Sequence, residues 1–187
     1  RPVGAGAGDR RERARPDRRR GGLGARFRGG RHVDPSGSSL KPCGSGTLEG
    51  WIGPDYNLFY EIELRHPNTQ AVAESHLVHP RNGVISFAST LYGRYQVAIK
   101  PRQGLRRVYP AMLITNGATF SAHTYVNGDA GNDNEVTVGD YALISLYFGL
   151  DSSSPFWSPQ ADLDGDEEVT IGDISIMSSR FGEAGED

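Results

Sequence analysis

Cysteine and long apolar stretches are nearly absent from this sequence of 187 residues. Cys43 is the only cysteine, so no disulfide can form within the chain. Small secreted domains are usually stabilised by disulfides or by bound metal, and of these two this chain can use only bound metal. No run of about 18 apolar residues occurs, so we predict no membrane span. A Ser-His-Asp set, paired glutamates and a glycine-rich phosphate loop are also missing, so we predict that the chain is not an enzyme.

The net charge of −3 hides two oppositely charged ends. Residues 1–32 hold eleven arginines against three acidic residues, and residues 127–187 hold fourteen acidic residues against Arg180 alone. We expect a disordered Arg/Gly-rich tail over 1–46, because this segment has too few apolar residues to bury. A basic arm attracts nucleic acid, but stacking aromatics are missing apart from Phe27, and we expect no nucleic-acid partner. The chain begins with Arg1, so no secretion signal is visible and we expect an incomplete N-terminus.

Short alternating runs separated by turn residues fill the middle of the chain. Tyr60, Ile62 and Leu64 alternate with charged residues, and the segment 95–100 alternates with the same period. Shorter runs occupy 84–88, 112–115 and 119–124. Strands of period 2 at this spacing indicate a small antiparallel sandwich with one buried face per sheet. We therefore predict a β-sandwich domain over 47–124.

This middle region resembles the carboxypeptidase regulatory-like, transthyretin-like sandwiches. The resemblance rests on Gly-Thr-Leu-Glu-Gly at 46–50, Tyr-Glu-Ile-Glu-Leu-Arg-His-Pro at 60–67, Gly-Val-Ile-Ser-Phe at 83–87, Leu-Tyr-Gly-Arg-Tyr-Gln-Val-Ala-Ile-Lys at 91–100 and Leu-Arg-Arg-Val at 105–108. It implies a spacer or interaction module rather than a catalyst.

The strongest signal is an internal repeat. When residues 129–149 are shifted by 33 positions onto 162–182, ten of the twenty-one positions are identical. The identical residues of the first copy are Asp129, Asp133, Glu135, Val136, Thr137, Gly139, Asp140, Ser145, Phe148 and Gly149. A duplication of this kind predicts two copies of one structural unit.

The spacing of the acidic residues in each copy predicts calcium binding. Calcium takes about six to eight oxygen ligands, and a twelve-residue loop supplies side chains from positions 1, 3, 5, 9 and 12 and a carbonyl from position 7. We predict one calcium ion in each copy. The predicted ligands of the first loop are Asp129, Asp133, Glu135 through its carbonyl, Thr137 and Asp140. Those of the second loop are Asp162, Asp164, Asp166, Glu168 through its carbonyl, Thr170 and Asp173.

The two loops differ at two positions. Gly131 occupies the third position of the first loop and Asp164 that of the second, so the first loop has three ligand carboxylates and the second has four. At the sixth position the turn requires a positive φ, which strains Glu167 by about 1–2 kcal/mol, whereas Asn134 tolerates it better. Ligand charge tunes calcium affinity over several decades. We therefore predict that the second loop binds calcium more tightly.

A helical pattern follows each loop. Tyr141, Ile144 and Phe148 are spaced as one apolar face, and the second copy repeats this pattern. Gly149 and Gly182 predict the ends of the two helices. The apolar residue at the eighth loop position, Val136 or Val169, predicts that the two loops pair with each other through a short strand.

A loop followed by a helix, with Asp at the twelfth position and no preceding helix, resembles the type I dockerin repeat. The matching segments are 127–141 and 161–174, preceded in the second copy by Pro-Phe-Trp-Ser-Pro at 155–159. The resemblance implies a small all-α domain of two loop-helix repeats over 125–187, two bound Ca²⁺ ions and a cohesin-like protein partner. In dockerins the tenth and eleventh loop residues help to select the partner and often bear hydroxyls, whereas this chain has Val138-Gly139 and Ile171-Gly172.

Three functions remain open at this point. The repeats could form a docking module for protein attachment in a polysaccharide-degrading system, or a calcium-stabilised end-cap that packs against the chain's own sandwich. They could also be the C-terminal accessory region of a glycoside hydrolase. In each case we expect an extracellular or cell-surface protein, because millimolar calcium outside cells fills even weak loops. Trp51 and Trp157 suit either sugar stacking or packing, and we expect packing.

Overall fold

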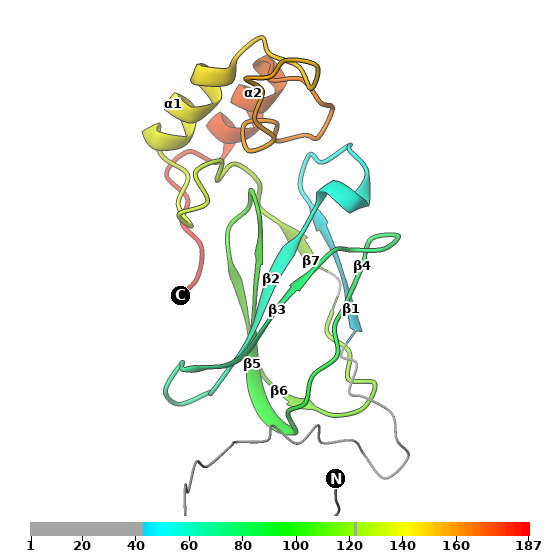
Figure 1. Ribbon diagram of the computed structural model, residues 1–187. Helices are drawn as coiled ribbons and strands as arrows, with labels where there is room; N and C mark the ends of the chain where they lie inside the picture. The colour runs from blue at the N-terminus through cyan, green and yellow to red at the C-terminus, as the bar shows by residue number, and fades with distance from the viewer. Residues whose placement is uncertain (1–42, 122) are drawn as a thin grey trace, which may run out of the picture. The chain divides into compact units, whose positions relative to one another are not determined.

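The computed structural model describes residues 43–121 and 123–187 (Figure 1). The expected disorder of the Arg/Gly-rich tail concerns residues that lie almost entirely outside this range. The strands are β1 (Cys43–Leu48), β2 (Tyr60–Arg65), β3 (Val72–Val78), β4 (Val84–Ser86), β5 (Gly93–Pro101), β6 (Arg107–Ile114) and β7 (His123–Tyr125). A 3₁₀ turn, η1 (Asp55–Asn57), precedes β2, and the helices α1 (Val138–Tyr147) and α2 (Ile171–Ser179) follow the strands. Among the described residues, no helix is long and apolar enough to cross a membrane.

The strands form two sheets, in the orders β4-β1-β7 and β3-β2-β5-β6. All neighbouring strands are antiparallel except β1 and β7, which are parallel. Side chains from both sheets bury one apolar core, in which the Tyr60 and Tyr125 rings lie 5.4 Å apart between their centroids. The β-sandwich predicted from the alternation is therefore confirmed, but the prediction that its strands are antiparallel is wrong for β1 and β7.

Strand β1 begins at Cys43, four residues before the predicted domain boundary at 47. The glycines that suggested a tail are there for steric reasons. A Cβ on Gly44 would lie 2.0 Å from the Phe120 ring, and a Cβ on Gly46 would lie 2.4 Å from the Tyr125 ring. At the other end, β7 includes Tyr125, one residue beyond the predicted boundary at 124.

The predicted strands also differ from the observed ones in number and length. Strand β3 has no counterpart among the predictions, because it is an edge strand whose Val72 and Leu77 are exposed and whose alternation is weak. The predicted run at 112–115 is the end of the longer β6, and the run at 119–124 shrinks to β7. Strand β2 has the bounds that its alternation indicated.

Helices α1 and α2 lie side by side (Figure 1). Thr137 and Thr170 are their N-caps, each in a capping box with the aspartate three residues later. Gly149 and Gly182 follow the helices with φ of 79° and 87°, the left-handed conformation that ends a helix. The predicted apolar face is wrong in part: Ile144 is buried, but Tyr141 and Phe148 are largely exposed.

A second apolar cluster joins the repeats, separate from the core of the sandwich. Leu105, from the turn between β5 and β6, is fully buried in it together with residues of both loops and both helices. The other buried members are Ala130, Val136, Ile144, Ala161, Leu163, Val169 and Met177.

Candidate metal-binding loops

Three predicted carboxylates gather in each loop, and the group in the second loop does not include Asp173. Oxygens of Asp129, Asp133 and Asp140 lie within 4.8 Å of one another, and so do oxygens of Asp162, Asp164 and Asp166. Oxygens bound to a calcium ion at about 2.3–2.6 Å can be no more than about 5 Å apart. Both loops therefore fit a calcium ion by the spacing and the chemistry of their oxygens.

Backbone amides hold the carboxylates of the first loop in place. Asp129 accepts hydrogen bonds from the amides of Asp133 at 3.0 Å and Asn134 at 2.8 Å. Asp140 accepts from the amides of Gly131 and Thr137, both at 2.7 Å. The first and twelfth residues thus close the loop from its two ends, and both are buried.

The second loop closes in the same way. Asp162 accepts from the amides of Gly165 at 2.7 Å and Glu167 at 3.0 Å. Asp173 accepts from the amides of Leu163 and Thr170. Asp162 and Asp173 are buried, so both copies use the same construction.

Thr137 and Thr170 are the N-caps of the helices, and Asp133 and Asp166 are the exposed members of the two carboxylate groups. The Thr137 and Thr170 hydroxyls accept from the amides of Gly139 and Gly172, each at 3.1 Å, and so cap the helices. Asp133 and Asp166 are exposed, and each accepts from the amide two residues later, that of Glu135 or Glu168.

The two loops do not pair with each other through Val136 and Val169, contrary to the prediction. The Val136 amide donates to the Glu183 carbonyl and its own carbonyl accepts from the Gly182 amide, both at 2.8 Å. Val169 pairs in the same way with the segment after α1, through Gly149 and Leu150. Each loop is therefore tied to the end of the helix that belongs to the other repeat.

Positive φ angles occur at the same two places in each loop. At the sixth position, Asn134 has φ 76° and Glu167 has φ 71°, as the turn requires. At the fourth position, Asn132 has φ 62° and Gly165 has φ 79°. Gly165 also lies against Trp51, where a Cβ would approach the indole ring to 2.6 Å.

Three residues that the sequence did not single out contact the loops. Lys100, at the end of β5, places its Nζ 2.7 Å from Asp129 Oδ2, and both side chains are buried. The Gln103 side chain donates to the Asp162 carbonyl at 2.6 Å. Asn127 Nδ2 donates to the carbonyls of Glu49 and Leu163. In the sequence, the only sign of these contacts is that Lys100 and Gln103 lie next to the apolar run of β5.

The charge environment differs between the loops. Burial, followed by the nearby charges of Asp173 and Asp164, raises the pKa of Asp162 to about 6. Burial also raises the pKa of Asp129, but the hydrogen bond and the positive charge of Lys100 oppose that rise. Burial and the Asp173 charge raise the pKa of Asp164. The second loop thus concentrates negative charge that favours a cation.

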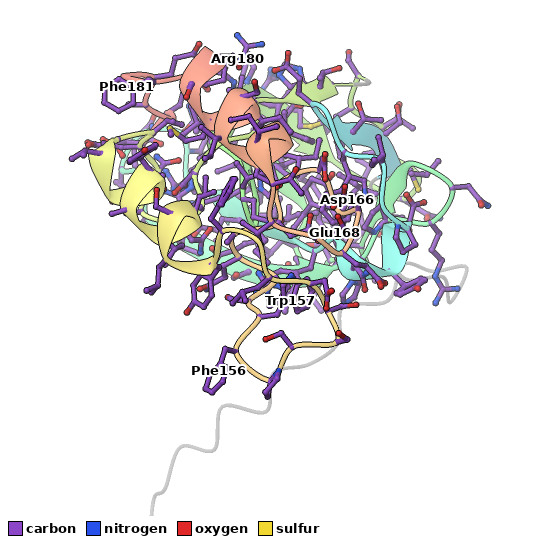
Figure 2. All side chains as sticks on the ribbon, turned by 90° about the horizontal axis from the view of Figure 1, so that it is seen from above. Phe156, Trp157, Asp166, Glu168, Arg180 and Phe181 are labelled. Carbon is purple, nitrogen blue, oxygen red and sulfur yellow. The ribbon has the colours of Figure 1, made fainter. Side chains whose placement is uncertain are left out.

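Both tryptophans are partly buried, and each packs against one of the two apolar clusters. Trp51 packs against the sandwich core and Trp157 against the cluster of the repeats. Both line a cavity of about 360 Å³ beside the second loop, together with Arg102 and Asp162. Figure 2 shows Trp157 next to the loop that carries Asp166 and Glu168, with Phe156 pointing away from it.

Comparisons with known proteins find similarity in solved structures. Two crystal structures of type II cohesin–X-dockerin complexes from Acetivibrio cellulolyticus, an N-terminal and a C-terminal interface mutant, each contain a chain of similar fold. Each match has 19% sequence identity and a TM-score of 0.60, and covers 78% of this chain and 97% of that chain. No protein-family model and no curated protein matches the sequence. At this identity the similarity extends to the fold, a β-sandwich chain that here carries two helices.

Proposed function

We propose that this chain is a non-catalytic module that uses calcium to order a surface for protein attachment, with residues 125–187 acting as a dockerin-like pair. The duplicated carboxylate groups of the two loops carry this proposal. Asp129, Asp133 and Asp140 would hold one ion, and Asp162, Asp164, Asp166 and Asp173 the other. When bound, the ion neutralises carboxylates that otherwise repel one another, and binding free energy becomes folding free energy.

Exposed apolar residues that recur with the repeat support an attachment surface. Val138 and Ile171, the tenth residues of the loops, are both 69% exposed at the starts of the helices. Phe148 and Phe181, at the far ends, are more than half exposed. Figure 2 shows Phe181 pointing outward from the end of α2. Apolar side chains in matching places on both helices suit a partner with an apolar face, rather than one that bonds hydroxyls.

The extent of the structural match supports the dockerin side of such a complex. The matched complexes contain cohesin and X-dockerin. Residues 43–125, which include all seven strands among the described residues, make up less than half of the chain. A match over 78% of the chain therefore extends well into the two loop-helix repeats.

Binding to immobilised cohesins, with calcium and with chelator, tests this proposal. We expect capture by at least one cohesin in calcium and none in chelator. The Ile171→Asp variant should weaken capture at least about tenfold, because a charge replaces an exposed apolar contact. Leu77→Asp on β3 is a matched control, since Leu77 is 67% exposed but lies on the sandwich. Capture that is independent of calcium, or equal losses in both variants, would refute the proposal.

A second function, calcium-dependent stabilisation of the sandwich, is supported by the polar contacts of Gln103 and Asn127 with the second loop. The carbonyl of Gln103 accepts from the amides of Gly128 and Asp129, both at 3.0 Å, while its side chain donates to the second loop. Chelation should then lower the melting temperature of the sandwich as well as that of the repeats. Asn127→Ala should reduce this coupling, whereas Asn68→Ala, in an exposed turn, should not. If the sandwich of the wild type melts at the same temperature with and without chelator, calcium does not stabilise it and this second function is excluded.

We also propose an extracellular or cell-surface location. Extracellular calcium modules work at Kd values of about 10⁻⁴–10⁻³ M, so even loops of weak affinity would be filled outside a cell. An accessory role beside a glycoside hydrolase is a further form of the same attachment function.

A further inference from the structure

One lysine reaches from the sandwich into the first loop. Lys100 belongs to β5, and its side chain is only 7% exposed. The ammonium lies 2.7 Å from Asp129 Oδ2 and 2.9 Å from the Gly104 carbonyl, so two acceptors hold it in place. Asp129 is the first ligand residue of the loop, and its side chain has no exposed area. This is a buried ion pair inside a predicted calcium site.

No such cation pairs with the second loop among the residues that the structure describes. The hydrogen bonds to the Asp162 carboxylate within this part of the chain come from the amides of Gly165 and Glu167. The neighbouring side chain is the neutral Gln103, and it donates to the backbone carbonyl of Asp162 rather than to its carboxylate. None of the ion pairs among residues 43–121 and 123–187 reaches a ligand carboxylate of the second loop.

The Lys100 ammonium donates to Asp129 Oδ2, the same oxygen that accepts from the Asn134 amide. Its charge therefore offsets one of the three ligand carboxylates of the first loop. A calcium ion entering this loop would lie near a fixed charge of its own sign, in surroundings where charges are weakly screened. The same charge attracts Asp129 when no metal is bound, which lets the loop close without an ion.

We propose that Lys100 is the built-in counter-cation of the first loop. The first loop then keeps its fold without calcium and binds the ion weakly, and the calcium response of the chain resides in the second loop. This inference rests on the proposed calcium-binding function and assigns its regulation to a residue of the sandwich.

Calcium titration of the full chain, followed by NMR, tests the inference loop by loop. The amides of Gly131 and Gly139 report the first loop, and those of Gly165 and Gly172 report the second. We expect the first loop of the wild type to bind at least about tenfold more weakly. Lys100→Met should raise the affinity of the first loop at least about tenfold and leave the second unchanged.

Two control variants separate charge from shape. Lys100→Arg keeps the positive charge and should keep the first loop weak. Arg65→Met removes a cation that pairs with Glu63 at 2.6 Å, at the end of β2 that pairs with Gln96, and should change neither affinity. A first-loop affinity that is unchanged or lowered in Lys100→Met overturns the inference.

Hydrogen exchange of the calcium-free wild type provides a test that needs no variant. The amides of Asp133 and Asn134, bonded to Asp129, should exchange more slowly than those of Gly165 and Glu167, bonded to Asp162. Equal exchange in the two loops overturns the inference. Absence of calcium binding at both loops of the wild type would instead refute the proposed function itself.

Discussion

The two loops have the same backbone construction and opposite electrostatic surroundings. In both, the first carboxylate accepts amides of the turn and the twelfth accepts the amide of the N-cap. Asp129, however, faces the Lys100 ammonium, whereas Asp162 lies near the charges of Asp164 and Asp173. Sequence identity between repeats therefore preserves the shape of a loop but not its charge balance, because the balancing group comes from outside the repeat.

The Lys100 charge beside the first loop suggests that the two copies have different roles. Under the proposed calcium binding, the first loop, which carries its own cation, would act as a permanent support. The second loop has four predicted ligand carboxylates and no paired cation among the described residues, and it would be the one that responds to calcium.

Removing the first predicted ligand charge should cost far more stability in the first loop than in the second when calcium is absent. Asp129→Asn leaves the buried Lys100 without its counterion, and breaking a buried ion pair from one side costs about 3–5 kcal/mol. Asp162→Asn removes a carboxylate that its neighbours repel and loses one acceptor, so stability should stay within about 1 kcal/mol of wild type. Urea unfolding in chelator measures both. Equal losses in the two variants would contradict the contrast.

Removing the exposed fifth ligand should show the reverse order when calcium is present. With calcium at 100 times Kd, binding stabilises the folded chain by about 2.7 kcal/mol. Asp166→Asn should lose most of this, since the second loop is the predicted tight site. Asp133→Asn, at the matching position, should lose no more than about 1.4 kcal/mol, because a site at least about tenfold weaker contributes at most that much at this calcium concentration. Calcium-dependent melting temperatures of the two variants decide the order.

Acid should weaken calcium binding more in the second loop than in the first. The pKa of Asp162 is raised from its ordinary 3.8 to about 6, so the folded chain holds that proton more tightly than the unfolded chain. The resulting stability of the calcium-free chain is fully present below about pH 4 and is lost as pH rises through about 6. Calcium competes with the same proton, so we expect about tenfold weaker binding at pH 5 than at pH 7.

The first loop provides the comparison, because Lys100 opposes the rise in the pKa of Asp129. Its calcium affinity should change less over the same pH range. Titrations at the two pH values, followed through the amides of Gly131 and Gly165, measure both loops in one sample. A larger change at Gly131 would reverse the assignment.

The loops and helix ends could be predicted from the sequence because their determinants are local. The twelve-residue spacing predicted that Asp129 and Asp140 would meet, and their oxygens lie within 4.8 Å of each other. Gly149 indicated the end of α1. Residues that act across the fold could not be found in this way. Lys100 lies 29 residues from Asp129 and meets it only because β5 ends beside the loop.

The errors in the fold have steric causes. Gly44 looked like part of a flexible tail, yet it lies in β1 because the Phe120 ring fills the space of a side chain. Val136 looked like a strand partner for Val169, yet the segments after the opposite helices take those hydrogen bonds. Apolar spacing predicted a buried face on α1, yet only Ile144 of the three residues is buried. In each case, contacts with segments distant in the sequence determine the neighbours of these residues, and the local pattern does not show them.

Relief of backbone strain gives the smallest predicted difference between the loops. Glu167 holds φ 71° and its exposed side chain accepts a hydrogen bond from Ser152 at 3.0 Å. This conformation strains Glu167 by about 1–2 kcal/mol, and glycine adopts it without that strain. Glycine also raises the conformational entropy of the unfolded chain, which offsets part of the gain. Glu167→Gly should therefore stabilise the calcium-free chain by about 0.5 kcal/mol.

Asn134→Gly, at the matching position of the first loop, should be destabilising. Asn134 tolerates its φ of 76°, and its Oδ1 accepts from the Arg106 amide at 2.8 Å, a bond whose loss costs about 1 kcal/mol. The sixth position would then be a strained turn in the second loop and an anchor to the sandwich in the first. Chemical unfolding of the two variants in chelator distinguishes these roles, and a gain in stability from Asn134→Gly would contradict the anchor, because strain would then outweigh the bond.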